Sequence, residues 1–390
     1  MIYQEVYLQR SCTLLTHRLR VGVLFGGKTG EHEVSVMSAQ SVLRALNPDK
    51  YEVVPIGISK SGNFIPGPQA MKSLEDGCVQ DNDSIAAFTI PDTMSDTIPD
   101  MKSNFPVLSD ITRAGKLDVV FPVLHGSFGE DGTIQGLLEL ASLPYVGSGV
   151  LASAVCMDKI MMKKLFQAHG FPQVRFESLT RRQVETDVSE VIAHIERTIG
   201  YPCFVKPANL GSSVGISKAN SRDTLKTALS DAAQYDRRLL VEEGLDVREI
   251  EIGVLGNDYP KVSVPGEIIP SGEFYDYRAK YISGDSALMI PAVVSEEQRK
   301  EIADLAIRAY LAADCAGLAR IDFFVERSTG RVLLNEINTM PGFTEYSMYP
   351  KLWETTGLSY AQLVEELIQC ALERHEEVRR NVTEFQIPES

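Results

Sequence analysis

Short apolar runs alternate with amphipathic stretches over the first part of the chain. Residues 21–25 form an apolar run typical of a buried strand, and residues 31–46 have the apolar spacing of a helix. A second apolar run at 51–58 predicts the next strand, and a third at 118–124 precedes a glycine-rich turn and a helix at 133–142. Because strands and helices alternate in this order, we expect an α/β fold that begins with a doubly wound parallel sheet.

The rest of the chain carries further strand and helix patterns, with a change of composition near residue 148. The expected helices lie at 151–169, 184–198, 221–235, 295–312 and 360–379. The expected strands lie at 173–177, 203–206, 215–218, 249–255, 317–325 and 332–337, and residues 239–242 begin the last region. Residues 60–115 are polar and rich in Asp, Ser, Pro and Met, which predicts mostly loop. We expect an N-terminal extension, an N-terminal α/β domain, a central subdomain and a C-terminal subdomain, at residues 1–19, 20–147, 148–241 and 242–380.

The balance of charge restricts the possible partners. The chain has 390 residues, with 38 Lys and Arg against 53 Asp and Glu, and a net charge of −15 at pH 7. Such an acidic chain repels nucleic acid and anionic membrane surfaces, so we expect neither as a partner. The six cysteines are scattered without metal-binding spacing, and no segment has the pattern of a signal peptide or a membrane span. We therefore expect a cytoplasmic protein with free thiols.

The first glycine-rich turn matches a nucleotide-binding pattern. Residues 22–29 fit the P-loop motif G-x-x-x-x-G-K-[ST], but a true P-loop has its strand before the first glycine. Here Gly22 lies inside the apolar run, so apolar side chains would fill the phosphate cradle. We favour a turn that presents Glu31 to a ligand, where its carboxylate suits an amine. The alternative is that Glu31 only caps the following helix.

Two apolar strands near the C-terminus carry polar side chains at alternate positions. Arg320 and Asp322 are two residues apart, as are Glu336 and Asn338, so each pair projects from one face of its strand. If the strands are antiparallel neighbours, that face presents the oxygen ligands that Mg²⁺ prefers, with phosphate oxygens needed to complete the coordination. Arg320 would then stabilise developing negative charge. The alternative is a polar face with a structural ion pair.

Two lysines indicate a phosphate site, and one loop has the composition of a lid. Lys206 ends a predicted strand before the Gly- and Ser-rich loop 207–215, whose N–H groups and hydroxyls can hold phosphate. Lys159 is a second candidate cation, and the alternative for either lysine is a solvated surface charge. Residues 274–281 mix aromatic and charged side chains without a period, which is typical of a lid over a polar site or of an ordinary surface loop.

Taken together over roughly residues 20–375, these motifs resemble the D-alanine:D-alanine ligases of the ATP-grasp superfamily. The segments that carry the resemblance are 26–35, 125–136, 157–159, 206–215, 275–281, 320–322 and 335–342. Tyr277, Lys280 and Tyr281 stand where the D-alanine-adding members have them, which favours a dipeptide product. The resemblance implies an α/β N-terminal domain and two ATP-grasp subdomains that hold the nucleotide between them. It also implies a homodimer formed through the N-terminal domain.

The resemblance further implies a reaction and a set of roles. The carboxylate of one D-alanine attacks the γ-phosphate of ATP to give an acyl phosphate and ADP. The amine of a second D-alanine then displaces phosphate, which supplies a precursor of peptidoglycan. Two Mg²⁺ ions, which Mn²⁺ can replace, are held by Asp322, Glu336 and Asn338. The residues implied around ATP are Lys159, Lys206, Ser213, Glu242, Leu245, Glu249 and Lys280.

Around the amino acids, the resemblance implies Glu31, His125, Tyr281, Arg320, Gly342 and Ser347. Glu31, Ser212, Tyr281, Arg320 and Gly342 are the implied catalytic residues. Two alternatives stay open: a related ligase that makes D-alanyl-D-lactate or D-alanyl-D-serine, and a nucleotide-binding switch built on the P-loop pattern.

Overall fold

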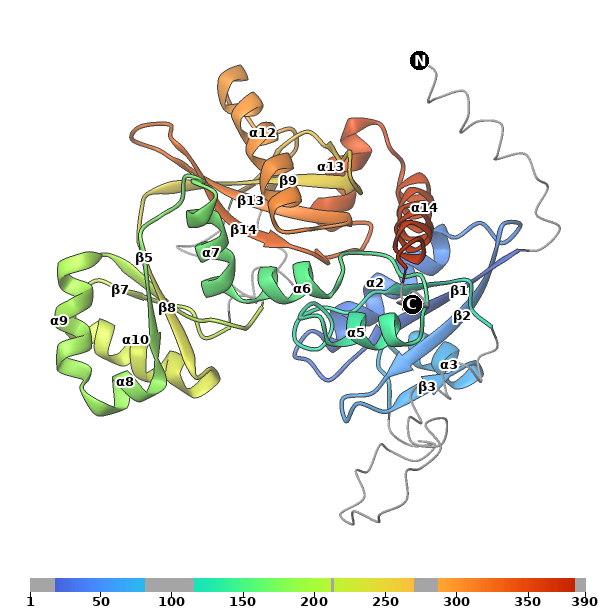
Figure 1. Ribbon diagram of the computed structural model, residues 1–390, viewed down its shortest axis with the longest axis horizontal. Helices are drawn as coiled ribbons and strands as arrows, with labels where there is room; N and C mark the ends of the chain where they lie inside the picture. The colour runs from blue at the N-terminus through green and yellow to red at the C-terminus, as the bar shows by residue number, and fades with distance from the viewer. Residues whose placement is uncertain (1–17, 81–115, 212–213, 270–286, 383–390) are drawn as a thin grey trace, which may run out of the picture.

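The structure, a computed structural model, describes residues 18–80, 116–211, 214–269 and 287–382. Within these ranges the strands form three sheets, which lie in different parts of the molecule (Figure 1). In the same ranges, no helix combines the length and hydrophobicity needed to cross a membrane. The domain boundaries drawn from the sequence stay predictions.

The first sheet follows the predicted alternation of strands and helices. Its order is β3-β2-β1-β4, with β1, β2 and β4 parallel and β3 antiparallel at the edge. The bounds are β1 Leu19–Gly26, β2 Tyr51–Ile58, β3 Phe64–Pro66 and β4 Val119–Pro122, with α2 His32–Ala45, α3 Pro68–Asp76, α5 Thr133–Leu140 and α14 Tyr360–Arg379. Val23 and Phe25 of β1 share a core with α2 and α14, whereas Leu24 shares a core with α5 on the opposite face. Helices therefore cover both faces, as the prediction of a doubly wound sheet requires.

The second sheet is antiparallel, in the order β5-β8-β6-β7. Its bounds are β5 Phe176–Thr180, β6 Cys203–Pro207, β7 Ser217–Ala219 and β8 Arg238–Glu243, with α8 Arg181–Thr186, α9 Val188–Thr198 and α10 Arg222–Tyr235. The three helices cover one face, where Val205 and Val241 lie in the core (Figure 1). Lys206 and Glu242 directly follow these residues along their strands, so they project from the other face.

The third sheet has the order β12-β11-β9-β13-β14, and β10 also pairs with β9. Its bounds are β9 Val247–Gly256, β10 Lys261–Val262, β11 Gly266–Ile269, β12 Ala287–Met289, β13 Gly317–Glu326 and β14 Val332–Asn338, with α12 Glu296–Ala312 and α13 Met348–Thr356. Every pairing is antiparallel. Ile321 and Phe323 of β13 pack in a core with α12, so the alternating Arg320 and Asp322 project from the opposite face.

Two predicted helices are each divided by an aspartate. The predicted helix 151–169 consists of α6 (Val150–Met157) and α7 (Lys159–Ala168), because Asp158 has extended backbone and its side chain accepts a hydrogen bond from Met161 N. Asp187 likewise separates α8 from α9 by accepting a hydrogen bond from Glu190 N. Aspartate side chains compete for backbone N–H groups, and here that preference interrupts the continuous apolar spacing.

Other differences concern short elements. The prediction of loop for 60–115 is wrong at its start, where β3 and α3 form, while residues 81–115 lie outside the described ranges. The strand predicted at 173–177 begins instead at Phe176. The sequence pattern does not predict β10, β11, β12 or α13. These elements are too short for a clear period, and three of them are strands that depend on pairing with β9 or β11.

Candidate active site

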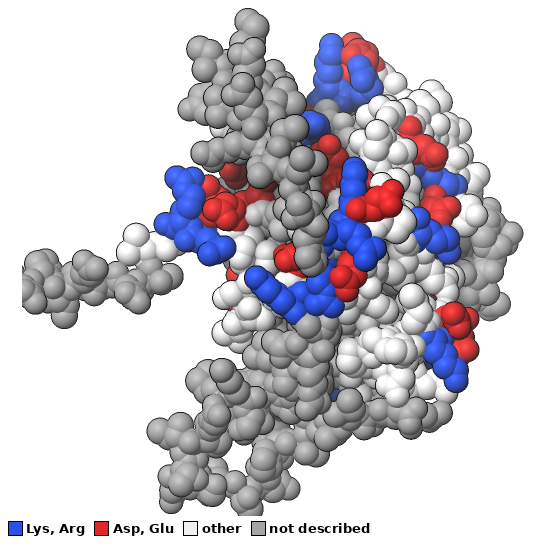
Figure 2. Space-filling model, turned by 90° about the vertical axis from the view of Figure 1, so that its right-hand side faces the viewer, with Lys and Arg blue, Asp and Glu red and all other residues white. Residues whose placement is uncertain are grey.

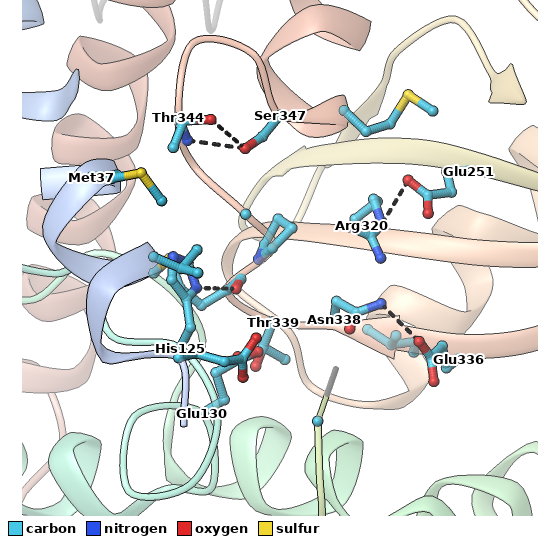
Figure 3. Close-up of a pocket in the computed structure, with 18 of the residues that line it drawn as sticks. Met37, His125, Glu130, Glu251, Arg320, Glu336, Asn338, Thr339, Thr344 and Ser347 are labelled. Carbon is cyan, nitrogen blue, oxygen red and sulfur yellow. Dashed lines mark hydrogen bonds and ion pairs between the residues drawn. The ribbon is translucent and has the colours of Figure 1, made fainter. Parts of the chain in front are cut away.

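A cavity of about 760 Å³ is lined by α2 along its length, the loop 125–130, the α6–α7 junction and strands β9, β13 and β14. The segment 339–351, which runs from the end of β14 into α13, closes another side. The cavity brings together eight of the residues predicted from the sequence: Glu31, His125, Lys159, Arg320, Glu336, Asn338, Gly342 and Ser347. Figure 3 shows His125 across the cavity from Arg320 and Asn338, so the N-terminal sheet and the third sheet supply opposite walls.

Glu31 stands at the N-cap position of α2, but its side chain makes no capping hydrogen bond with that helix. It lies instead against two glycine loops. A Cβ added to Gly126 would come within 2.7 Å of Glu31 Oε2, and one added to Gly211 would come within 3.1 Å. Glycines at these positions leave room for the carboxylate in the cavity wall. Of the two interpretations of Glu31, helix capping is therefore wrong.

The P-loop interpretation of residues 22–29 is also wrong. Strand β1 extends through Gly26, so the positions that would wrap a phosphate are strand. Val23, Leu24 and Phe25 are fully buried in the two cores beside the sheet. The turn follows the end of the strand, where Gly26 and Gly27 have φ angles of 89° and 104° that favour glycine.

Arg320 lies between two carboxylates at the other wall. Its Nε and Nη2 donate to the two oxygens of Asp322, each at 2.8 Å, and Nε lies 3.0 Å from Glu251 Oε2. In the register of β13 and β14, Arg320 is opposite Asn338 and Asp322 is opposite Glu336, which confirms the predicted antiparallel pairing. Burial alone would lower the pKa of Arg320, but Asp322 and Glu251 outweigh it and raise the pKa, so the guanidinium stays charged.

The donor set on these strands suits a metal that arrives with a phosphate ligand. Asp322, Glu336 and Asn338 bring two carboxylates and an amide oxygen onto adjacent strands. Among the described residues, no group of three or more His, Cys, Asp and Glu side chains forms a closed metal site. A Mg²⁺ ion held here would need phosphate oxygens and water to complete its octahedron, which is how Mg²⁺ binds with nucleotides.

A buried ion triad lies between α7 and the face of the second sheet opposite α8, α9 and α10. Glu242 Oε2 is 2.5 Å from Lys206 Nζ, and Oε1 is 2.7 Å from Nζ of Lys163 in α7. Burial would raise the pKa of Glu242, but the two lysines outweigh it and lower the pKa to about 2. Burial would lower the pKa of Lys206, but Glu242 outweighs it, with help from Glu336 and Glu249, and raises the pKa. Lys206 is thus not a solvated surface charge, and the triad carries a net positive charge that attracts anions.

Lys159 lies at the start of α7, on the wall of the cavity. Its Nζ donates to the carbonyl oxygen of Leu210 at 2.7 Å. Because Leu210 lies within the Gly- and Ser-rich loop 207–215, this bond brings a cation to the loop predicted to hold phosphate.

Ser347 and Gly342 adjoin each other at a further wall. Ser347 Oγ accepts a hydrogen bond from Thr344 N at 3.1 Å and lies 2.8 Å from Thr344 Oγ1. A Cβ added to Gly342 would come within 3.1 Å of Ser347 Oγ. Ser347 is the N-cap residue of α13, so the positive end of that helix dipole begins at the cavity.

His125 is held in one tautomer by its neighbours. Its Nδ1 lies 3.2 Å from the carbonyl oxygen of Met340, which can only accept, and its Nε2 lies 3.0 Å from Ser38 Oγ. Burial lowers the pKa of His125, and Glu31 opposes this shift only in part. The neutral imidazole therefore donates from Nδ1 and accepts from the Ser38 hydroxyl.

Glu130 lies beside this histidine and lines the same cavity (Figure 3). Its Oε1 accepts a hydrogen bond from Gly126 N at 2.8 Å. Desolvation, followed by repulsion from Glu31, raises the pKa of Glu130 from its ordinary value of 4.5 to about 8. The folded protein therefore keeps a proton on Glu130 over a pH range in which the unfolded chain has lost it.

We expect the free energy of unfolding to depend on pH because of this proton on Glu130. Since the folded-state pKa is raised, Glu130 makes the free energy of unfolding fall as pH rises from about 4.5 to about 8, by up to about 1.4 kcal/mol per pH unit. Glu130→Gln keeps the acceptor for Gly126 N but does not titrate. Urea unfolding at several pH values should show the variant gaining stability relative to the unsubstituted protein as pH rises. A difference that does not change with pH would contradict this prediction.

Several predicted residues are not part of the cavity wall. Ser212, Ser213, Lys280 and Tyr281 lie outside the described residues, as does most of the predicted lid. Lys206 does not line the cavity. Nor do the three residues predicted around adenine and ribose, Glu242, Leu245 and Glu249. Asp322 does not line it either, but it is bonded to Arg320, which does.

Three residues at or beside the site are not predicted from the sequence: Glu130, Lys163 and Glu251. Glu251 could be found by strand alternation, because it stands two positions after Glu249 and so shares its face of β9. Lys163 follows Lys159 by one helical turn, and Glu130 lies within the motif that begins at His125, but neither position signals its partner. Their pairings depend on contacts between distant elements.

Comparison with known proteins covers nearly all of the chain. Residues 20–148 match the family model described as "D-ala D-ala ligase N-terminus", and residues 165–369 match the model described as "D-ala D-ala ligase C-terminus". The chain is 51% identical over 368 residues to a protein of Natranaerobius thermophilus named D-alanine--D-alanine ligase, with 94% of this chain and 99% of that protein covered.

Two solved structures are similar in fold as well as in sequence. One is the D-alanine-D-alanine ligase from Coxiella burnetii, with a TM-score of 0.75 and 35% identity, covering 93% of this chain and 96% of the other. The second is the VanG D-Ala:D-Ser ligase from Enterococcus faecalis, with a TM-score of 0.76 and 34% identity, covering 91% of this chain and 100% of the other.

Proposed function

We propose a mechanism from the premise that the chain belongs to the D-alanine–D-alanine ligase family and joins two molecules of D-alanine in an ATP-dependent reaction. In this mechanism the carboxylate of the first D-alanine takes the γ-phosphoryl group of ATP, which forms an acyl phosphate and releases ADP. The amine of the second D-alanine attacks the acyl carbon, and phosphate leaves. The observation that best supports it is that Arg320 and Asn338 share one cavity with Glu31 and His125.

The nucleotide would bind between the second and third sheets. Lys159, Lys206 and Lys280 would neutralise phosphate charge, and Ser213 would hold phosphate with the loop that follows β6. Glu242, Leu245 and Glu249 would bind adenine and ribose. Two Mg²⁺ ions, which Mn²⁺ can replace, would be held by Asp322, Glu336 and Asn338, and would supply positive charge for the triphosphate.

The amino acids would occupy the 760 Å³ cavity. Glu31 would pair with the ammonium of the first D-alanine, which the neutral His125 adjoins. Arg320 and the N–H of Gly342 would stabilise the oxyanion formed when the second amine attacks. Ser347 would hold the second carboxylate at the positive end of α13. Ser212 and Tyr281 would close a hydrogen-bonded network with Glu31 and exclude water, which would otherwise hydrolyse the acyl phosphate.

The same proposal extends to the setting of the enzyme. We propose an N-terminal α/β domain at 20–147 and two ATP-grasp subdomains at 148–241 and 242–380, assembled as a homodimer through the N-terminal domain. The enzyme would work in the cytoplasm, where it would supply D-alanyl-D-alanine for peptidoglycan. Neither nucleic acid nor membrane would be a partner, given the net charge of −15.

A product assay tests the proposal directly. With ATP, Mg²⁺ and D-alanine, we expect release of ADP and phosphate in step with a dipeptide of the mass of D-alanyl-D-alanine. Release of ADP that is indifferent to D-alanine would contradict the proposal.

The acceptor deserves a separate test, because one of the similar structures is a D-Ala:D-Ser ligase. D-Serine and D-lactate should be offered in competition with D-alanine at several pH values. We expect D-alanyl-D-alanine as the main product, with a yield that rises with pH, because the attacking ammonium must lose a proton. A D-lactate product would lack this dependence, and a dominant D-serine product would favour the alternative acceptor.

A further inference from the structure

Asp322 is engaged by hydrogen-bond donors at both of its oxygens. Arg320 donates to Oδ1 and Oδ2 at 2.8 Å each, and Asn338 Nδ2 also donates to Oδ2, at 2.9 Å. A carboxylate held by a guanidinium in this bidentate manner cannot offer the same lone pairs to a metal ion. If Asp322 is to bind a metal with the nucleotide, Arg320 must give up part of this pairing.

Glu251 offers Arg320 a second carboxylate. Glu251 Oε2 lies 3.0 Å from Arg320 Nε, and Figure 3 shows this pair beside the cavity. Glu251 is only 4% exposed. In the sheet it is opposite Asp322 on β9, while Glu336 is opposite Asp322 on β14, so three carboxylates form one row across three strands.

This row explains how the charges can be redistributed. Three carboxylates against one guanidinium leave a net charge of about −2, which a divalent cation would balance. Glu336 and Asp322 lie on the two strands predicted to hold metal, whereas Glu251 lies on β9 and is paired with Arg320. Arg320 can therefore keep one ion pair when Asp322 turns to a metal.

We propose that Glu251 is a positioning residue, which anchors Arg320 and so releases Asp322 for the metal-bound nucleotide. The inference rests on the proposed function, since it takes Asp322 as a metal ligand and Arg320 as the group that stabilises the oxyanion. Without Glu251, Arg320 would have no second carboxylate to pair with when it gives up Asp322. The affinity for a divalent cation would therefore fall.

The test measures metal binding without turnover. Free Mn²⁺ is followed by electron paramagnetic resonance during titration of the full-length protein in the presence of ADP. Glu251→Gln keeps the size of the side chain and removes its charge, and we expect it to weaken Mn²⁺ binding about tenfold. The matched control is Glu267→Gln, because Glu267 is also buried and paired with an arginine, Arg248, in the same sheet but away from the cavity. Equal Mn²⁺ affinities in the two variants would overturn the proposal.

A double variant separates positioning from direct metal binding. In an Arg320→Met background there is no guanidinium for Glu251 to anchor. We therefore expect the further change Glu251→Gln to alter Mn²⁺ affinity by less than about threefold, a non-additive result. A tenfold loss that persists in this background would mean that Glu251 acts on the metal itself, and the proposal would be wrong.

The Mg²⁺ dependence of the rate is a second test, because a general structural defect would not change it selectively. In Glu251→Gln we expect the Mg²⁺ concentration for half-maximal rate to rise and kcat to fall about tenfold, with KM for ATP at saturating Mg²⁺ within about twofold. If the Gln variant does not fold, Glu251→Asp should show a smaller change in the same direction, and an unchanged Mg²⁺ requirement there would count against the proposal. A wild-type protein that makes no dipeptide would refute the proposed function, while the Mn²⁺ titrations would still report on Glu251.

Discussion

Replacing Arg320 by Met is expected to lower the rate of dipeptide formation by about 10³-fold, because a buried charge directed at a developing oxyanion is among the largest single contributions to catalysis. Before substrate binds, both oxygens of Asp322 hold the guanidinium at 2.8 Å and Glu251 holds it at 3.0 Å, and Glu251 would continue to hold it when Asp322 turns to the metal. Methionine fills a similar volume without charge. The measurement is kcat for D-alanyl-D-alanine, together with nucleotide affinity, which should change far less than kcat.

The control for this variant is Arg248→Met. Arg248 forms a bidentate pair with the buried Glu267, on the same sheet, but it does not line the cavity. The Arg248→Met variant measures the loss of stability and activity that follows from breaking an arginine–carboxylate pair in this sheet outside the cavity. If both variants lost activity in proportion to their loss of stability, Arg320 would be a structural residue and the proposed mechanism would fail.

Replacing Lys206 by Met is expected to weaken nucleotide binding about 10²-fold, because the triad on the second sheet would lose the charge that faces the phosphates. The fold should persist, since Glu242 keeps its 2.7 Å ion pair with Lys163. Calorimetric titration with ADP and Mg²⁺ measures the effect. The rise in melting temperature that ADP causes in the unsubstituted protein should also shrink.

Lys28→Ala is the matched control for Lys206. Lys28 is the lysine of the P-loop pattern, but it is exposed and follows a strand that extends through Gly26. We expect its loss to leave nucleotide affinity unchanged within about twofold. If Lys28→Ala abolished binding and Lys206→Met did not, the nucleotide would lie on the first sheet, and the proposed site would be wrong.

The architecture could be predicted in large part because its signals are local. The apolar runs and turns placed β1, β2, β9, β13 and β14 within a few residues of their observed bounds. The spacing of Arg320 and Asp322, and of Glu336 and Asn338, already implied that each pair shares a face of its strand. Only the pairing of the two strands as neighbours had to be assumed. Where local signals compete, prediction fails, as at Asp158, whose capping bond ends a helix that the apolar spacing would continue.

Most of the ion pairs at the site could not be predicted, because they join charged residues that are distant in the sequence. No local pattern indicates that Lys163 and Lys206 would share the carboxylate of Glu242, or that Glu251 would face Arg320. The P-loop pattern shows the converse: the motif is intact in the sequence, yet burial of residues 23–25 on both faces of β1 removes any cradle.

By itself, the amino-acid sequence determined the order of strands and helices, the family, and the residue types available for phosphate and metal, since these depend on periodicity and motif over short spans. The tertiary structure alone decided which charges meet. Glu31, His125 and Arg320 come from loops and strands that are far apart in the chain, and only the packing of the first sheet against the third places them around one cavity. The physical reason is that desolvation and Coulomb interaction act over a few ångströms in space, whatever the distance along the chain.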